Sequence, residues 1–137
     1  MKKIIINTLA CLILIGVFSN CTNNNEDLQL ELTMQEKVAI LETGEWLLKD
    51  FEETIMHTFK DGEEFTYYGD KGEFKAAIPG TKDYWIEDDK LFIDFNFGNV
   101  FSYHIKMSCN NNIIELIKDG EVNKTLLKRS SNYKECF

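Results

Sequence analysis

The chain has 137 residues, and its 23 acidic residues outnumber its 15 Lys and Arg, which gives a formal net charge of −8 at pH 7. This length fits one domain with its own core. The acidic balance argues against nucleic acid as a partner, because phosphates would be repelled, and against lying flat on an anionic lipid surface.

The first twenty residues have the pattern of a cleaved signal peptide. Lys2 and Lys3 give a positively charged start, and an apolar run follows from Ile4 to Phe18. This run is too short, and too closely followed by three asparagines, to make a good membrane span. We therefore expect residues 1–20 to be removed, which leaves a still more acidic mature chain.

The segment Phe18-Ser19-Asn20-Cys21 lies where a lipobox would lie. It resembles the loose lipoprotein signals of Bacteroidota, with Phe18 in place of the common Leu and Asn20 in place of a small residue. The resemblance implies that the Cys21 thiol carries a diacylglyceryl group and that its freed amine takes a further chain, such as palmitate. Two or three acyl chains anchor a protein stably. The alternative is ordinary signal cleavage with a free Cys21.

Residues 21–32 are predicted to form a flexible tether, because the stretch from Asn23 to Asp27 is polar and acidic. The lipid would hold a monomeric domain in the cell envelope at the outer membrane. In some Bacteroidota lipoproteins, acidic residues just after the lipidated cysteine direct export to the surface. Glu26 and Asp27 lie slightly later than that signal, so periplasmic and surface-facing orientations both stay open.

The folded domain is predicted over 33–137, beginning with a helix at 33–43. Thr33 and Glu36 have capping-box spacing, and Gly44 follows where a helix can stop. One face of this helix repeats at i, i+4 and i+7. It consists of Met34, Val38 and Leu41.

From Glu45 onward the pattern is one of short strands joined by tight turns, about one every ten residues. Asp61-Gly62 is a strong two-residue hairpin signal. The spacing predicts an all-β antiparallel meander of eight or nine strands, and closure into a barrel is favoured over a sandwich because it removes exposed edges. The predicted runs are 45–51, 54–60, 63–68, 73–78, 83–87, 90–97, 100–108, 113–118 and 121–128.

Strict alternation in the two clearest runs predicts an aromatic and aliphatic interior. Polar residues such as Asp94 and His104 fall on the opposite face. No inward charged cluster is predicted. The residues predicted to face inward are Leu91, Ile93, Phe95, Phe97, Phe101, Tyr103, Ile105 and Met107.

Three short motifs resemble lipocalins, and more closely the lipocalin-like lipoproteins of Bacteroidota. Gly44-Glu45-Trp46 matches the Gly-x-Trp that opens the first lipocalin strand, Lys128-Arg129 ends the last run, and the stretch from Trp85 to Leu91 is common in those lipoproteins. The resemblance covers residues 44–129. It implies that Trp46 plugs one barrel end and that Arg129 or Lys128 packs over its face as a cation.

The resemblance also implies a non-enzymatic carrier of a small apolar ligand, because barrel mouths are natural pockets. The alternative is that the inward aromatics fill the core and that the domain is an envelope adaptor for a protein or glycan. The candidate ligand-binding residues are Phe65, Tyr67, Trp85, Phe95, Phe101 and Tyr103.

Cys109 and Cys136 are the disulfide candidates if Cys21 is acylated. The compartment outside the inner membrane permits disulfides. A bridge would close a loop of about 28 residues and stabilise the fold by roughly 2–4 kcal/mol. Two unpaired thiols are the alternative.

The sequence offers little for catalysis, and neither a cofactor nor a metal is expected. The two histidines, His57 and His104, form no metal-binding motif and are predicted on outer faces, with Met56 and Met107 in the core. Three acid pairs are predicted as solvated turn charges rather than catalytic carboxylates. They are Glu52-Glu53, Glu63-Glu64 and Asp88-Asp89.

Overall fold

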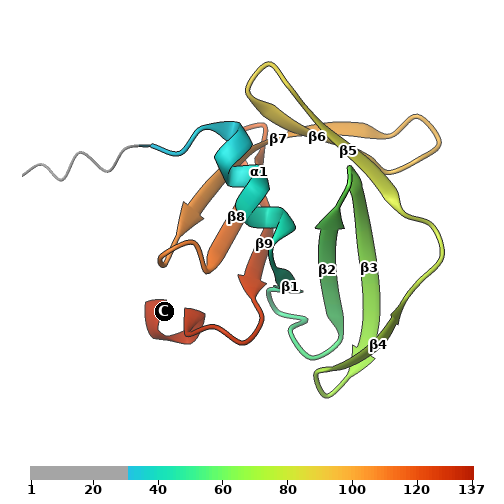
Figure 1. The fold of residues 1–137 in the computed structure, drawn as a ribbon, viewed down its shortest axis with the longest axis vertical. Helices are drawn as coiled ribbons and strands as arrows, with labels where there is room; N and C mark the ends of the chain where they lie inside the picture. The colour runs from blue at the N-terminus through green and yellow to red at the C-terminus, as the bar shows by residue number, and fades with distance from the viewer. Residues whose placement is uncertain (1–30) are drawn as a thin grey trace, which may run out of the picture. The chain divides into compact units, whose positions relative to one another are not determined.

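The computed structural model describes residues 31–137 (Figure 1). The predicted signal peptide, Cys21 and most of the tether lie outside the described residues. No helix in the described part of the chain is long and apolar enough to cross a membrane.

The predicted helix is present as α1 (Met34–Glu42). Its start is fixed by the capping box: the Glu36 amide donates to Thr33 Oγ1 at 3.3 Å, and the Thr33 amide donates to Glu36 Oε2 at 2.8 Å. Thr43 is the C-cap of the helix, one residue before Gly44. Its buried side chains are the three predicted from spacing, Met34, Val38 and Leu41.

The prediction of an antiparallel barrel is confirmed. Eight strands close a barrel, because β1 pairs with both β2 and β9, and β3 pairs with both β2 and β5. The ninth strand, β4, extends the sheet beside the C-terminal part of β3. The strands are β1 (Glu45–Leu48), β2 (Ile55–Lys60), β3 (Glu63–Asp70), β4 (Glu73–Ala77), β5 (Lys82–Glu87), β6 (Lys90–Asp94), β7 (Val100–Ser108), β8 (Ile113–Lys118) and β9 (Glu121–Lys128).

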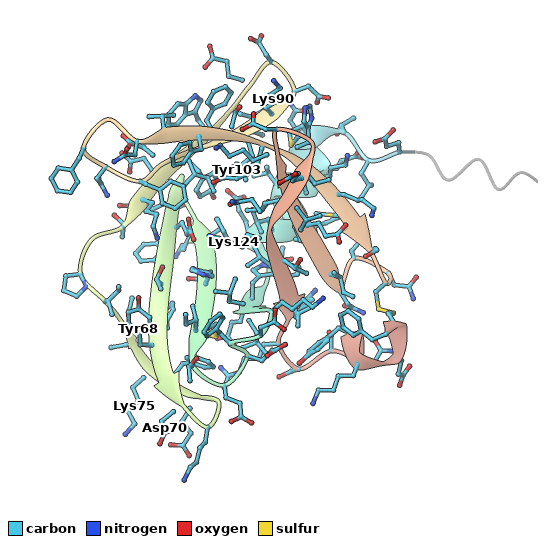
Figure 2. All side chains as sticks on the ribbon, turned by 180° about the vertical axis from the view of Figure 1, so that it is seen from behind. Tyr68, Asp70, Lys75, Lys90, Tyr103 and Lys124 are labelled. Carbon is cyan, nitrogen blue, oxygen red and sulfur yellow. A yellow bond between two sulfur atoms is a disulfide. The ribbon has the colours of Figure 1, made fainter. Side chains whose placement is uncertain are left out.

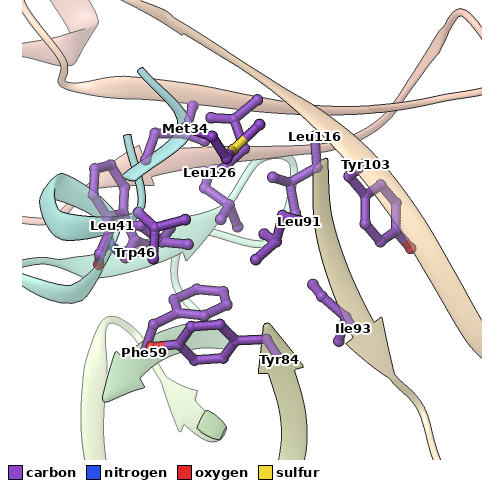
Figure 3. Packing of buried hydrophobic residues seen from close by; sticks show 13 residues of the cluster. Met34, Leu41, Trp46, Phe59, Tyr84, Leu91, Ile93, Tyr103, Leu116 and Leu126 are labelled. Carbon is purple, nitrogen blue, oxygen red and sulfur yellow. Dashed lines mark hydrogen bonds between the residues drawn. The ribbon is translucent and has the colours of Figure 1, made fainter. Parts of the chain in front are cut away.

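The helix closes one end of the barrel. It contacts β2 on one side of the barrel and β6 and β7 on the other, so it spans the opening between them. Its apolar face joins the interior residues in one cluster (Figure 3). The Tyr84 hydroxyl on β5 donates a hydrogen bond to Glu42 at the end of the helix, which ties the helix to the wall. The buried cluster consists of Met34, Val38, Leu41, Trp46, Phe59, Tyr84, Leu91, Ile93, Tyr103, Ile105, Ile114, Leu116 and Leu126.

Trp46 lies beneath this end, where the lipocalin resemblance predicts a plug. It is fully buried, and its Nε1 donates to the Leu41 carbonyl at 2.7 Å. The prediction that Arg129 or Lys128 covers its face is wrong: within residues 31–137 no cation lies over the Trp46 ring. Lys128 is the cross-strand partner of Trp46, so the next residue, Arg129, points to the opposite face. There Arg129 binds Glu45 at 2.9 Å and lies over the Phe74 ring.

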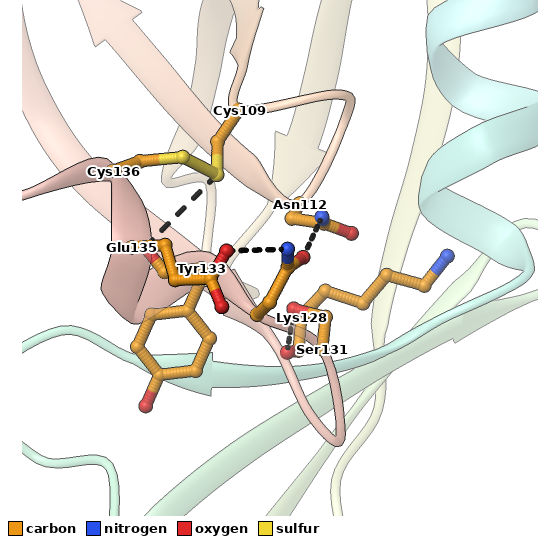
Figure 4. The surroundings of a disulfide bond; sticks show 8 residues. Cys109, Asn112, Lys128, Ser131, Tyr133, Glu135 and Cys136 are labelled. Atoms are coloured by element: carbon orange, nitrogen blue, oxygen red, sulfur yellow. Dashed lines mark hydrogen bonds between the residues drawn. A yellow bond between two sulfur atoms is a disulfide. The ribbon is translucent and has the colours of Figure 1, made fainter.

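A second apolar cluster lies outside the barrel, under the C-terminal segment. The 3-10 helix η1 (Tyr133–Cys136) packs the buried Tyr133 onto it. Cys109 and Cys136 form a disulfide that ties this segment to the end of β7 (Figure 4). The buried members of the cluster are Leu47, Met56, Ile113, Leu127 and Tyr133.

The predicted run 90–97 is too long. Strand β6 ends at Asp94, whose Oδ1 accepts from the Asn96 amide, and both Asn96 and Phe97 have positive φ. The chain therefore turns before Phe97, which is fully exposed rather than in the core. Phe95 stays partly buried against the interior cluster.

Candidate functional site

The barrel wall formed by β2 and β3 presents polar side chains to the interior. Trp46 faces inward and pairs with His57, which pairs in turn with Thr66. Paired residues of neighbouring antiparallel strands point to the same face. His57 and Thr66 therefore face inward, as does Glu64, which pairs with the buried Phe59.

Two lysines join this group from other strands. Lys82 on β5 pairs with Glu64, and Lys124 on β9 pairs with the buried Leu116. Figure 2 shows Lys124 between β9 and the β2–β3 hairpin. His57, Lys82 and Lys124 each lie two positions from an apolar core residue of their own strand, and Glu64 pairs with the buried Phe59, so the group sits beside the apolar core. We call the polar cluster the set His57, Glu64, Thr66, Lys82 and Lys124.

Glu64 is the centre of the polar cluster. Its Oε1 lies 3.0 Å from His57 Nδ1, 3.2 Å from Lys124 Nζ and 3.8 Å from Lys82 Nζ. Thr66 Oγ1 accepts from Lys82 Nζ at 3.2 Å and lies 3.1 Å from His57 Nδ1. All three cationic or basic partners therefore converge on one carboxylate oxygen.

The other carboxylate oxygen, Glu64 Oε2, has no hydrogen-bond partner among the described residues, although it is buried. An unsatisfied buried acceptor costs about 1–3 kcal/mol, and more when it is charged. Solvent still reaches the two lysines, which are 21% and 15% exposed, whereas Glu64 is 0% exposed. The cluster is thus an unsaturated polar site with its lysines toward solvent.

The polar cluster keeps Glu64 ionised. Burial alone raises the pKa of Glu64, but the hydrogen bond from His57 and the charges of Lys124 and Lys82 outweigh it and lower the pKa to about 2. Burial is also the largest influence on His57 and lowers its pKa, aided by the two lysines and opposed by Glu64. At neutral pH His57 is therefore neutral, and its Nδ1–H donates to Glu64, because a carboxylate only accepts.

Aromatic rings line the side of the cluster toward the barrel mouth. Phe95 and Phe101 lie 5.6 Å apart, and the Nζ atoms of Lys82 and Lys124 lie 5.6 and 5.8 Å from the Phe95 ring centre. Lys118 lies over Phe101 at 4.6 Å. Phe101 is 37% exposed, so these rings form a rim open to solvent.

Three of the six predicted ligand-binding residues share this interior: Phe95, Phe101 and Tyr103. The other three point outward, contrary to prediction. Phe65 and Tyr67 pair with Thr58 and Met56 on the outer face. Trp85 is 38% exposed and stacks on Phe92 at 5.5 Å.

Two further predictions are corrected here. His57 is buried rather than solvated, and Glu64 is not a solvated turn charge. His104 and Asp88-Asp89 are exposed as predicted. The error came from treating the aromatic face of 63–68 as inward. The two-residue turn at Asp61-Gly62 pairs Phe59 with Glu64. Because paired residues share a face, an inward Phe59 would have predicted that Glu64 also points inward.

A separate groove of about 930 Å3 lies outside the barrel. None of the polar cluster and none of the six predicted ligand-binding residues lines it. Phe51 and Phe137 are exposed there, and Lys49 Nζ lies 5.2 Å from the Phe137 ring centre. The lining residues are Leu47, Lys49, Asp50, Phe51, Glu52, Glu53, Thr54, Lys71, Gly72, Tyr133, Lys134 and Phe137.

Within residues 31–137 no group of three or more His, Cys, Asp or Glu is arranged to hold a metal ion. No protein-family model matches the chain, and comparison with curated proteins and with solved structures finds no match either.

Proposed function

We propose that this chain is a non-enzymatic binding protein of the cell envelope, anchored through a lipid on Cys21, which takes a small molecule at the polar cluster in its barrel. The observation that carries the proposal is the buried and ionised Oε2 of Glu64, which has no hydrogen-bond partner among residues 31–137. Native proteins satisfy nearly all buried polar atoms. A buried acceptor that lacks a partner and lies beside two partly exposed lysines is therefore a candidate contact for a ligand.

The packing of the barrel limits the size and nature of that ligand. The interior next to α1 is filled by fully buried side chains, among them Trp46, Phe59 and Leu126. A large apolar ligand would have to displace them. The proposal therefore differs from the apolar carrier expected from the lipocalin resemblance: the ligand is small, and its polar end meets Glu64.

Native mass spectrometry of the mature chain, purified without detergent, tests this proposal. The expected result is a co-purifying small mass that is lost in Lys124→Met and kept in Lys106→Met, a lysine paired with Glu115 on the outer face. If several preparations carry no bound mass, and a thermal-shift screen of envelope metabolites finds no stabilising compound, the proposal fails.

The anchor has its own test. The Cys21→Ala variant is expected to appear as soluble protein, because it lacks the thiol that accepts the lipid. A Cys11→Ala variant, which removes a cysteine inside the predicted signal peptide, should stay with the membrane. Unchanged membrane retention of Cys21→Ala would exclude lipid anchoring at this residue.

The outer groove supports a second candidate function, that of an adaptor for another envelope protein or a glycan. Exposed aromatic side chains such as Phe51 and Phe137 are typical of recognition surfaces. Cross-linking in cells would distinguish the two: loss of a cross-linked partner in a Phe51→Ala, Phe137→Ala double variant supports the adaptor, and an unchanged pattern argues against it.

A further inference from the structure

We infer that the polar cluster recognises a small carboxylate that also carries a hydrogen-bond donor on the neighbouring carbon, that is, an α-hydroxy or α-amino acid with an aromatic or similar apolar side chain. This inference rests on the proposed function and names the ligand class for the same site.

The carboxylate of the ligand would be held by the two lysines. An ammonium group has three N–H donors. Within the described residues, Lys124 Nζ uses one on Glu64 Oε1, and Lys82 Nζ binds Thr66 and lies 3.8 Å from the same oxygen. Both ammonium groups therefore have donors to spare, and charge-assisted hydrogen bonds to a carboxylate are among the strong ones.

Charge balance points the same way. Two lysines meet one ionised carboxylate, and His57 is neutral, so the cluster has an excess positive charge inside a chain whose net charge is −8. A buried or partly buried charge without a counterion is unfavourable. One ligand carboxylate supplies the missing charge.

Glu64 Oε2 is the reason why the ligand needs a hydrogen-bond donor. A simple carboxylate bound to the lysines would place its own oxygens near this ionised acceptor, which repels them. A hydroxyl or ammonium group on the α-carbon lies next to the acid group and can donate to Oε2. It thereby satisfies the acceptor that has no partner in the described residues.

The aromatic rim provides the remaining contact. Phe95 lies beside Lys82 and Lys124, and Phe101, which solvent reaches, lies 5.6 Å from Phe95. A ligand whose polar end meets Glu64 would project its side chain toward these rings. Aromatic pairs at such separations add to the free energy of burial, so we choose probes with a phenyl group.

Isothermal titration calorimetry with the full-length mature chain in lipid nanodiscs tests the inference with four matched probes, and empty nanodiscs serve as the blank. 3-Phenyllactate and phenylalanine carry both the acid and the donor. Comparing their affinities shows whether the site prefers a hydroxy acid or an amino acid. 3-Phenylpropionate lacks the donor, and 2-phenylethylamine lacks the acid. We expect at least one donor-carrying acid to bind roughly tenfold or more tighter than phenylpropionate, a difference of about 1.4 kcal/mol, because it adds a hydrogen bond to a charged acceptor.

Variants then assign the binding to the cluster. Glu64→Gln should remove most of the preference for the donor, and Lys124→Met should weaken all three acids. Lys106→Met, on the outer face, should change neither. Circular dichroism of each variant checks its fold, and the four-probe comparison with the unaltered chain stands even if Glu64→Gln does not fold.

The outcomes separate this inference from the proposed function. If phenylpropionate binds as tightly as both donor-carrying acids, or if the preference survives Glu64→Gln, the inference is overturned while small-molecule binding stands. If neither donor-carrying acid binds at millimolar concentration, the inference is also overturned, and the native mass spectrum alone decides the proposed function.

Discussion

The His57 imidazole donates its Nδ1 proton to Glu64 inside the barrel, with 3.0 Å between His57 Nδ1 and Glu64 Oε1. The two residues lie on adjacent strands of one hairpin, on the face that also carries Phe59. In the described part of the chain, His57, Lys82 and Lys124 all lie at Glu64 Oε1, and Oε2 has no hydrogen-bond partner. The hairpin thus supplies three of the five residues of the polar cluster, His57, Glu64 and Thr66.

Removing the charge of Glu64 alone should destabilise the fold, because it leaves Lys82 and Lys124 without their counterion. We expect Glu64→Gln to lower the free energy of unfolding by about 1–3 kcal/mol, less than for a fully buried pair because the lysines reach solvent. The triple variant Glu64→Leu, Lys82→Met, Lys124→Met should recover that loss or exceed the original stability. Urea denaturation measures both. A triple variant less stable than Glu64→Gln would mean that the cluster is structural.

Acid should destabilise the protein in two steps. The folded-state pKa of His57 is lowered, so the unfolded chain takes up its proton first, and stability falls as the pH drops below about 6.5. The pKa of Glu64 is lowered from 4.5 to about 2. Its contribution of about 3 kcal/mol is therefore complete above pH 4.5 and is lost as the pH falls toward 2.

Urea titrations at a series of pH values separate the two steps. His57→Gln should remove the step below pH 6.5 and keep the lower one. His104→Gln, an exposed control on β7, should keep both. A step below pH 6.5 that persists in His57→Gln would contradict the assignment.

A methyl group at Gly44 should disturb the barrel plug. A Cβ there would lie 2.6 Å from Cε2 and 2.7 Å from Nε1 of Trp46, whose indole is buried and hydrogen-bonded to Leu41. We expect Gly44→Ala to cost about 1–3 kcal/mol of stability, as overpacking does. Gln35→Ala, at an exposed position of α1, should be neutral or slightly stabilising.

A double-mutant cycle checks the cause. In a Trp46→Phe background the smaller ring lacks the indole nitrogen, so Gly44→Ala should cost clearly less than in the unaltered chain. Equal costs in both backgrounds would place the effect in the backbone rather than in the contact with Trp46.

Breaking the disulfide should destabilise the domain and release its C-terminal segment. Cys109 and Cys136 are 27 positions apart, and a loop of this length is typically worth about 2–4 kcal/mol. Thermal denaturation of Cys136→Ser should show that loss. Hydrogen exchange should rise around Tyr133, which the bridge holds on the outer cluster, and stay unchanged in α1. Unchanged exchange at Tyr133 would mean that packing alone holds the segment.

Local signals in the sequence determined α1 and the turns. The helix begins at a capping box whose partners are three residues apart, and the hairpin after β2 turns at Asp61-Gly62, where both residues have positive φ. Alternation in β6 and β7 also predicted the inward residues from Leu91 to Ile105 correctly, except where the chain turns before Phe97. These features depend only on residues close in the chain.

The facing of β3 and β5 was decided by pairing. Taken alone, the aromatic residues Phe65, Tyr67 and Trp85 favour an inward assignment, but register places them outside. A strand has two faces, and its pairing with neighbouring strands determines which of them is buried. The neighbouring two-residue turns carried that information, since they fix which residues pair across each hairpin.

The polar cluster itself required closure of the barrel. Lys124 binds Glu64 across 60 positions of sequence, and Lys82 reaches it only because β3 pairs with β5. The sequence by itself determined a capped helix followed by short antiparallel strands with an acidic surface, because capping, turns and alternation act between near neighbours. Only the tertiary structure decided that a glutamate, a histidine and two lysines meet inside, because a charge is stable there only among partners that distant strands supply.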